Sequence, residues 1–212
     1  MAKGGSSQRW LREHETDPYV RMARERGYRS RASFKLIALD DKEHLLRPGA
    51  TVVDLGAAPG GWSQIATQRV GPKGRIVACD CLPLDPLPGV EFLQGDLNDP
   101  ALVAALLALI GAGGAQVVLS DLAPAMSGIK TVDQARSFLL CECALDVAEA
   151  VLAPGGAFVV KVFQGEGFES FLRLLRARFA KVAMRKPEAS RGRSAEIYAV
   201  ARGYRPGYAI LE

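Results

Sequence analysis

The sequence lacks an apolar stretch at its N-terminus. Residues 1–10 read MAKGGSSQRW and contain no run of hydrophobic side chains. A secretory signal needs such a run at its centre. We therefore expect no secretory signal and a cytoplasmic location.

Long hydrophobic runs are also scarce, and one segment alone imitates a membrane span. Residues 101–119 contain a single polar side chain, Gln116. However, glycines at 111–114 interrupt the segment well before the roughly 20 residues that a bilayer-crossing helix needs. Asp99 and Pro100 ahead of it are typical of a helix N-terminus. We predict a buried helix, a turn and a buried strand, with no membrane association.

Cysteine is infrequent as well. The four cysteines form two C-x-C pairs, Cys79 with Cys81 and Cys141 with Cys143, whereas zinc ligands are usually spaced more widely. The second pair lies in a helical pattern, where residues two apart point about 200° away from each other. We predict small, buried, reduced side chains and no metal site.

The charge is spread unevenly along a chain of otherwise ordinary composition. With 49% hydrophobic and 24% charged residues, the 212 residues suit a soluble α/β protein. Residues 1–35 hold nine Lys and Arg against four acids, a net +5, and residues 173–193 hold Glu188 as their only acid. Such clusters favour a polyanionic partner, although a solvated arm explains the first one equally well. We predict a basic arm over 1–20 that need not be ordered, and one domain over 21–212.

Strand and helix patterns alternate after the basic arm. A helical spacing of apolar residues runs over 33–46 and ends before Arg47-Pro48-Gly49. Further patterns predict strands at 51–55, 75–79, 90–93, 116–120, 157–162, 182–185 and 196–201, and helices at 62–70, 101–110, 132–152 and 168–179. No helix separates the last two strands, so one of them should run antiparallel. We predict an α/β fold with a mostly parallel, seven-stranded sheet and helices on both faces.

Sheets of this kind bind ligands beyond the carboxyl ends of their strands. The first strand is followed there by GAAPGG at 56–61. This turn resembles the dinucleotide fingerprint, but Ala58 replaces its middle glycine, and Trp62 would crowd a pyrophosphate. The turn that contains Gly56 and Gly60 therefore favours a ligand that is not a dinucleotide.

Aspartates follow the next three strands, as Asp80, Asp96 and Asp121. A carboxylate at 80 can accept hydrogen bonds from ribose hydroxyls, and one at 96 from an adenine amino group. Each could also be a simple cap or turn residue. Together with the glycine turn they predict S-adenosylmethionine, because carboxylates suit its ammonium and sulfonium and would repel a pyrophosphate. The pattern thus indicates a class I methyltransferase.

The sequence further resembles the FtsJ family of ribosomal RNA ribose 2′-O-methyltransferases. The matching segments follow the family's order and cover nearly all of the chain after about residue 17: YRSRASFKL at 28–36, DLGAAPGGWSQ at 54–64, QGD at 94–96, SDLAPAMSG at 120–128, VKVFQG at 160–165 and KPEASRGRSAEIY at 186–198. The resemblance implies a Rossmann-like fold and contacts to S-adenosylmethionine at Gly60, Trp62, Asp80, Asp96 and Asp121. It also implies a catalytic tetrad of Lys35, Asp121, Lys161 and Glu196.

The tetrad has a physical interpretation of its own. Lys161 interrupts an apolar strand, where a lysine is costly unless it is paired or reaches the rim of the sheet. Asp121 and Glu196 are natural counter-charges, and with Lys35 the four side chains sum to zero. We assign Lys35 and Glu196 to orienting the substrate ribose and holding Lys161. For Tyr198 we favour a side chain that fills its strand over one that faces the substrate.

The reaction that the resemblance implies is attack of a ribose 2′-oxygen on the sulfonium methyl group. A neutral thioether leaves without help from an acid, so the enzyme must position the hydroxyl and remove its proton. An ordinary lysine, with a pKa of about 10.4, is a poor base at neutral pH. The sequence therefore leaves two roles open for Lys161: a general base, or a cation that orients the hydroxyl.

The substrate that the resemblance implies is a uridine in the A loop of 23S ribosomal RNA, within the large ribosomal subunit. The basic clusters could form a phosphate-binding track, with Tyr28 as a stacking residue. We expect a monomer. Methylation of transfer RNA or a cap, an NAD-dependent oxidoreductase and a non-catalytic RNA-binding assembly factor remain alternatives.

Overall fold

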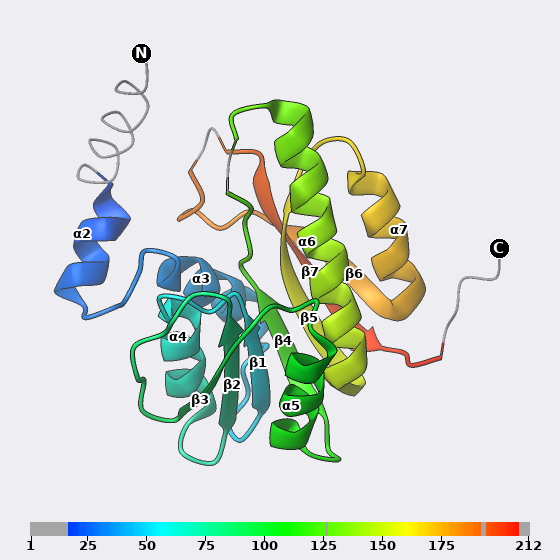
Figure 1. Ribbon diagram of the computed structural model, residues 1–212. Helices are drawn as coiled ribbons and strands as arrows, with labels where there is room; N and C mark the ends of the chain where they lie inside the picture. Colours follow the sequence, from blue (N-terminus) through cyan, green and yellow to red (C-terminus); the bar gives the residue numbers. More distant parts are fainter. Residues whose placement is uncertain (1–16, 126, 192–193, 208–212) are drawn as a thin grey trace.

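A seven-stranded sheet forms the centre of the protein in the computed structural model, which describes residues 17–125, 127–191 and 194–207 (Figure 1). The strand order is β3-β2-β1-β4-β5-β7-β6. The strands are β1 (Thr51–Leu55), β2 (Arg75–Asp80), β3 (Val90–Gln94), β4 (Ala115–Ser120), β5 (Leu152–Phe163), β6 (Phe179–Arg185) and β7 (Glu196–Tyr204).

Strand direction follows the prediction. Strands β1 to β5 pair in parallel, and β7 runs antiparallel to both of its neighbours, β5 and β6. The absence of a helix between the last two strand patterns therefore identified an antiparallel strand correctly. Strand β5 begins at Leu152, five residues earlier than its apolar pattern indicates, because its first residue pairs with Ala115 around an irregularity in the register.

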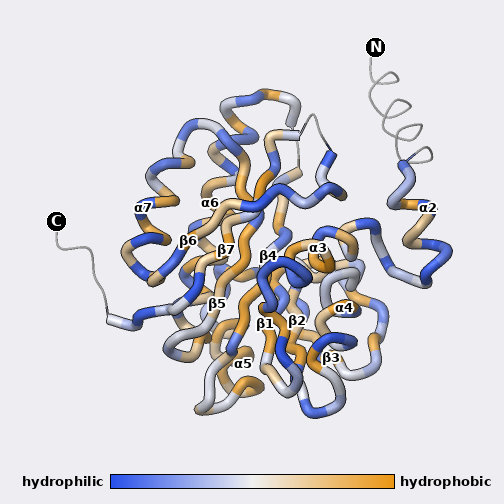
Figure 2. The backbone as a smooth tube through the Cα atoms, turned by 180° about the vertical axis from the view of Figure 1, so that it is seen from behind, coloured by the Kyte–Doolittle hydropathy of each residue, from blue (hydrophilic) through white to orange (hydrophobic). Residues whose placement is uncertain are grey.

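Helices cover both faces of the sheet, which confirms the predicted class of fold. Helices α5 (Pro100–Ile110), α6 (Lys130–Val151) and α7 (Phe168–Arg178) share one apolar cluster with the sheet. Helices α3 (Ser33–Glu43) and α4 (Gly61–Val70) share a second cluster on the opposite face. Figure 2 shows the hydrophobic strands enclosed between these layers.

Two helices begin with the same Asp-Pro signal. Asp99 accepts a hydrogen bond from the Ala101 amide and caps α5, as predicted, and the segment 101–119 forms a helix, a turn and strand β4. Asp17 accepts one from the Tyr19 amide and caps helix α2 (Pro18–Glu25), which we did not predict from the sequence. The last residues of the expected N-terminal arm, 17–20, thus lie in a helix and its cap, and residues 1–16 lie outside the described residues.

The helix that we predicted over 33–46 ends earlier, at Glu43. His44 adopts a left-handed conformation with φ 50°. The buried carboxylate of Asp40 accepts hydrogen bonds from the amides of Leu45 and Leu46, both at 2.8 Å. A side chain that binds these amides stabilises the turn in place of another helical turn.

The cysteines follow the prediction only in part. Cys79 and Cys141 are buried, and burial raises the pKa of each thiol to about 12. Cys81 is exposed, contrary to our expectation, because it lies just beyond the end of β2. Among the described residues no group of three or more His, Cys, Asp or Glu is placed to hold a metal ion, and no helix is long and apolar enough to cross a membrane.

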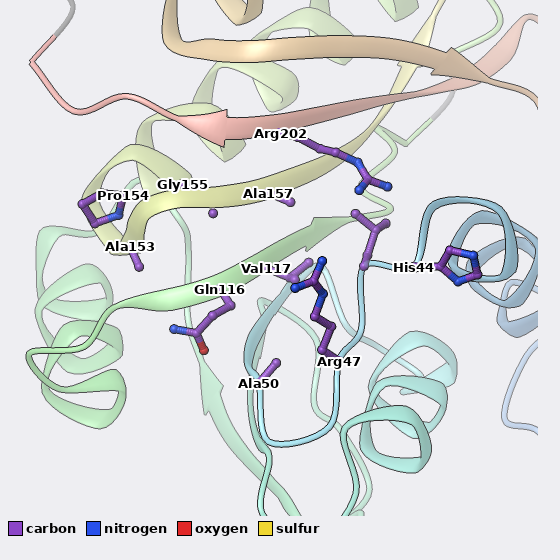
Figure 3. A pocket seen from close by; sticks show the side chains of 12 residues that line it. His44, Arg47, Ala50, Gln116, Val117, Ala153, Pro154, Gly155, Ala157 and Arg202 are labelled. Atoms are coloured by element: carbon purple, nitrogen blue, oxygen red, sulfur yellow. The ribbon is translucent and has the colours of Figure 1, made fainter.

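The two ends of the sheet differ in character. At the amino ends of β4 and the parallel part of β5, a cavity of about 290 Å³ is lined by Arg47, Gln116 and Arg202 (Figure 3). The predicted functional residues lie at the opposite ends of these strands.

Candidate active site

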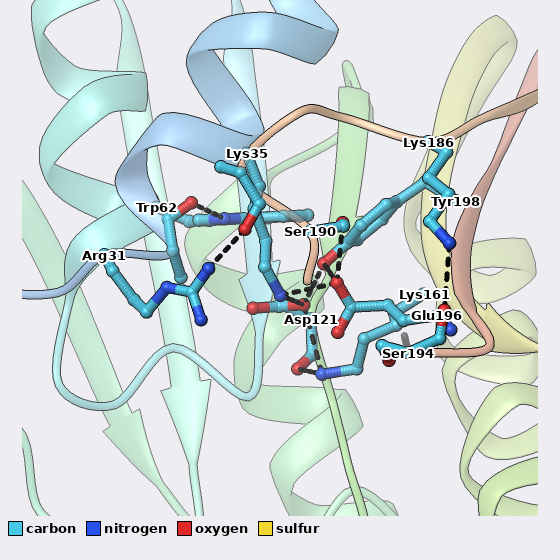
Figure 4. A network of polar contacts seen from close by, with 12 residues as sticks. Arg31, Lys35, Trp62, Asp121, Lys161, Lys186, Ser190, Ser194, Glu196 and Tyr198 are labelled. Atoms are coloured by element: carbon cyan, nitrogen blue, oxygen red, sulfur yellow. Dashed lines mark hydrogen bonds and ion pairs between the residues drawn. The ribbon is translucent and has the colours of Figure 1, made fainter. Parts of the chain in front are cut away.

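Four charged side chains from distant parts of the chain meet at the carboxyl ends of the central strands (Figure 4). Lys35 Nζ lies 2.8 Å from Glu196 Oε1 and 3.9 Å from Asp121 Oδ1. Lys161 Nζ lies 3.1 Å from Asp121 Oδ1 and donates to the Asp121 carbonyl at 2.6 Å. The structure therefore brings together all four residues of the predicted tetrad.

Strand register explains why two members of the tetrad share one face. Lys161 in β5 stands opposite Tyr198 in β7, and Phe163 stands opposite Glu196. Side chains two residues apart in a strand point to the same side. Asp121 follows the neighbouring strand β4 directly, so its carboxylate reaches the same place.

Lys35 reaches the site because the start of α3 is fixed to α4. The Ser33 hydroxyl donates to the Gly61 carbonyl, and the Trp62 indole N–H donates to the Ala32 carbonyl at 2.8 Å. These contacts place α3 above the sheet, with Lys35 only 8% exposed. A buried lysine needs counter-charges, and Glu196 and Asp121 supply them.

Tyr198 has a role that we did not predict from the sequence. It is fully buried, as we favoured, but its hydroxyl donates to Asp121 Oδ1 at 2.6 Å. Burial first, and then the charges of Asp121 and Glu196, raise the pKa of Tyr198 well above its usual value. The phenol therefore stays protonated and holds the Asp121 carboxylate in place. In the sequence, the only indication of this role was that an aromatic residue stands two positions after Glu196 in a strand.

Glu196 is held in its charged form. Burial alone would raise the pKa of Glu196, but the charge of Lys35 and its hydrogen bond, the charge of Lys161 and the Ser190 hydroxyl together lower it. Two lysines and two carboxylates then give a net charge of zero. This balance makes their shared burial tolerable.

The glycine turn leaves room beside this cluster. Gly56 and Gly60 have φ of 75° and 102°, which favours glycine. A Cβ at Gly56 would lie 2.3 Å from Leu122, so a side chain there would clash with the segment after β4. A cavity of about 40 Å³ is lined by Asp54, Gly56, Trp62 and Asp121.

The predicted cofactor residues differ in their surroundings. Asp80 accepts hydrogen bonds from the amides of Ala58 and Leu82, at 2.9 and 2.8 Å, and so braces the glycine turn. Asp96 is exposed and accepts from the Asn98 amide. Trp62 is 3% exposed and packs against Tyr198 at a ring distance of 5.7 Å. Contact of these residues with a cofactor stays a prediction.

The residues present fit S-adenosylmethionine. The buried hydroxyl of Ser120, next to Asp121, has no hydrogen-bond partner among the described residues. Asp54, Asp80 and Asp121 surround the glycine turn with carboxylates, which suits a ligand with positive groups. The cavity at the turn is small, so most of such a cofactor would lie outside it.

Arg29 links the glycine turn to the segment that follows β2. Its guanidinium donates to the carbonyls of Asp85 and Pro86, both at 2.7 Å, and to that of Pro59 at 3.3 Å. Arg31 is likewise engaged, with Asp17 at 2.8 Å and the Ala189 carbonyl. These two arginines of the first basic cluster therefore stabilise the fold, and a continuous phosphate track stays a prediction.

We expect Arg29→Ala to weaken binding of S-adenosylmethionine about tenfold, because hydrogen bonds from a charged group hold the wall of its predicted site. Titration calorimetry would measure the dissociation constant. Arg24→Ala, which removes the same charge from an exposed position on α2, is the matched control. Equal affinities of the two variants would show that Arg29 does not shape the site.

A Rossmann-like sheet, a glycine turn after β1 and carboxylates beyond the strands define the class of this protein as a methyltransferase. Within this class, residues 28–204 match the model of the FtsJ-like methyltransferase family, and the chain belongs to that family.

Relatives and solved structures agree with this assignment. Proteins named ribosomal RNA large subunit methyltransferase E from Pseudomonas paraeruginosa and Pseudomonas aeruginosa are each 54% identical over 205 residues, covering 97% of this chain and 99% of the relative. A crystal structure from Plasmodium falciparum, named as a putative ribosomal RNA methyltransferase, is 29% identical, with a TM-score of 0.76 over 84% of this chain and 98% of that chain. A fibrillarin/Nop5p complex, at 20% identity and a TM-score of 0.59 over 83% of this chain and 85% of that chain, shares the fold.

Proposed function

We propose that the protein transfers a methyl group from S-adenosylmethionine to the ribose 2′-hydroxyl of a uridine in 23S ribosomal RNA, in the A loop of the large subunit. The observation that carries the proposal is the convergence of Lys35, Asp121, Lys161 and Glu196 beside the glycine turn. The names of the 54% identical relatives support ribosomal RNA of the large subunit as the substrate. We propose a cytoplasmic location as well.

The residues of the site divide the work. S-adenosylmethionine, when bound, supplies an activated methyl group. Gly56, Gly60, Trp62, Asp80 and Asp96 would hold it, together with Asp121. Lys161, which lies 3.1 Å from the Asp121 carboxylate, would contact the ribose hydroxyl and either accept its proton or orient its lone pair. Lys35 and Glu196, 2.8 Å apart, would position the ribose and keep Lys161 in place.

Labelled methyl transfer tests the proposal. The purified protein would be given S-adenosylmethionine with a labelled methyl group and one of three substrates from a strain that lacks the enzyme: large subunits, free ribosomal RNA or transfer RNA. We expect label in large subunits above the other two. Label in transfer RNA alone would favour the alternative substrate. If none of the three substrates is labelled, the result would favour a non-catalytic assembly factor. If the protein retains NADH, the result would favour an NAD-dependent oxidoreductase.

Asp54 gives the proposed cofactor site a dependence on pH. Burial of its carboxyl, offset in part by the Ser63 hydroxyl at 2.6 Å and reinforced by the charges of Asp121 and Asp80, raises the pKa of Asp54 to about 7. Asp54 is thus neutral below pH 7 and charged above it. A cationic ligand binds better to the charged form, so affinity should rise as pH rises through 7.

We therefore expect S-adenosylmethionine to bind about tenfold more tightly at pH 8 than at pH 6. In Asp54→Asn this difference should disappear, since the asparagine keeps the shape but does not titrate. Calorimetric titrations at both values would measure the two affinities for each protein. An unchanged pH dependence in Asp54→Asn would assign it to another group.

A further inference from the structure

A second cavity lies between the end of β5 and the start of α6, at the same end of the sheet as the tetrad. It measures about 340 Å³, within the range of roughly 300–1,000 Å³ that is usual for small-molecule sites. Lys130 and Gln134 line it from α6, Phe163 and Gln164 from β5 and the residue after it, and Ala195 from the residue before β7. None of these side chains has a role in the proposed catalytic tetrad or in the proposed cofactor site.

Two residues that line this cavity are near members of the tetrad in the chain. Phe163 is two residues beyond Lys161, a separation of about 6.6 Å along a strand, and stands directly opposite Glu196. All three side chains therefore project from the same face. The Gln164 amide donates to the Ala195 carbonyl, which closes the same corner from the other strand. The cavity therefore lies at the same end of the sheet as Lys161 and Glu196, because it is lined by Phe163, two residues after Lys161, and by Ala195, the residue before Glu196.

Phe163 is available for a ligand. Its side chain is half-buried, and within the described part of the chain it belongs to none of the three apolar clusters that form the core. An apolar side chain at the end of a buried strand usually packs into the core, and Phe163 does not. It provides a flat surface on which an aromatic ring can stack.

The remaining polar groups of the cavity suit a base. The side chain of Gln134 lies against the backbone of Gly165, where an added Cβ would come within 1.9 Å of its Nε2 and the side chain would have to move. The side-chain amides of Gln134 and Gln164 form no hydrogen bond with any described residue. The segment before α6, which forms the neighbouring wall of the cavity, is held in place because buried Asp133 accepts hydrogen bonds from the amides of Ser127 and Gly128. Free amides can pair with the edge of a nucleobase.

We propose that this cavity holds the base of the nucleotide that is methylated. Phe163 stacks on the base, the amides of Gln134 and Gln164 pair with its edge, and Lys130 lies where a neighbouring phosphate can bind. The base and the 2′-hydroxyl are attached to adjacent carbons of one sugar, so a ribose at the tetrad places its base beside it. The inference rests on the proposed function and adds the part of the site that selects the base.

The test compares methyl transfer to large subunits that carry uridine at the target position with transfer to subunits that carry cytidine there. We expect Phe163→Ala to lower both rates about tenfold, because stacking does not depend on the identity of the base. Gln134→Glu and Gln164→Glu should each change the ratio of the two rates about tenfold towards cytidine. A carboxylate only accepts hydrogen bonds, and the cytosine amino group donates one where uracil has a carbonyl.

Leu139→Ala is the matched control, because Leu139 is an apolar residue of α6 that is 64% exposed. It should leave both rates unchanged, and all variants should bind S-adenosylmethionine as the parent protein does. If both glutamate variants keep the parent's ratio, or if Phe163→Ala behaves like Leu139→Ala, the inference is wrong and the proposed function stands. If the parent protein labels no RNA, both are wrong.

Discussion

Replacing Lys161 with alanine is expected to lower the rate of methyl transfer by about 10²- to 10⁴-fold, the range for loss of a positioned proton-transfer group. Binding of S-adenosylmethionine should change little. Among the described residues the Lys161 amine lies within hydrogen-bond distance of Asp121 alone, whose carbonyl and carboxylate oxygens it contacts. Two of its positions are thus occupied, and the third, a proton in the charged amine or a lone pair in the neutral one, remains for the substrate hydroxyl. Single-turnover labelling of large subunits, together with a calorimetric titration of the cofactor, would measure both quantities.

Lys161→Arg separates the two roles that the sequence left open. Arginine keeps the positive charge but does not give up its proton, so it can orient a hydroxyl and cannot act as a base. Recovery of much of the lost rate in Lys161→Arg would favour the orienting cation. A rate as low as that of Lys161→Ala, with loss of a rise in rate with pH that the parent protein shows, would favour the base. Wild-type activity of Lys161→Ala would remove this residue from the mechanism.

Replacing Asp121 with alanine should be as damaging, and for two reasons. The carboxylate contacts Lys161 at 3.1 Å, Lys35 at 3.9 Å and the Tyr198 hydroxyl at 2.6 Å, so its removal leaves buried positive charge without its main partner. Removal of one partner from a buried ion pair commonly costs about 3–5 kcal/mol. We expect a loss of transfer of about 10²-fold or more, a lower melting temperature and, unlike Lys161→Ala, weaker binding of the cofactor.

Two companion variants show whether charge or shape explains the loss. Asp121→Asn keeps the shape of the side chain and one acceptor oxygen, removes the charge and replaces the other oxygen with an NH₂ donor. Glu196→Ala should lose less activity than Asp121→Ala, because Lys161 Nζ contacts Asp121 and lies beyond ion-pair distance of Glu196. Thermal unfolding and single-turnover rates would rank the three proteins. A larger loss in Glu196→Ala than in Asp121→Ala would contradict the assigned roles.

Much of the site could be predicted because its residues lie next to strong strand patterns. Asp80 and Asp121 lie at the ends of apolar strands, and the rule that ligands bind beyond the carboxyl ends of parallel strands brings them together. Lys161 was conspicuous as a charge in an apolar run. Lys35 was different, since only the resemblance to a family indicated that a helix before β1 would reach the same place.

The features that were missed depend on contacts between distant segments. Nothing in the sequence near Tyr198 indicates that its hydroxyl binds Asp121, 77 residues away. Asp54 looked like part of a strand, and the pKa of its carboxyl follows from burial beside Ser63 and two other acids. Helix α2, by contrast, carried a readable signal in Asp17-Pro18, the same one that located α5. Its polar, arginine-rich composition directed attention to charge instead.

The reaction that we propose takes place on a sugar hydroxyl and not on a base. The most direct test is to digest large-subunit RNA, labelled by the protein with S-adenosylmethionine, to nucleosides and to separate them by chromatography with mass detection. We predict that the label is found in 2′-O-methyluridine and that Lys161→Ala yields almost none. Label on the base of any nucleoside, with an unmodified ribose, would contradict the proposed chemistry.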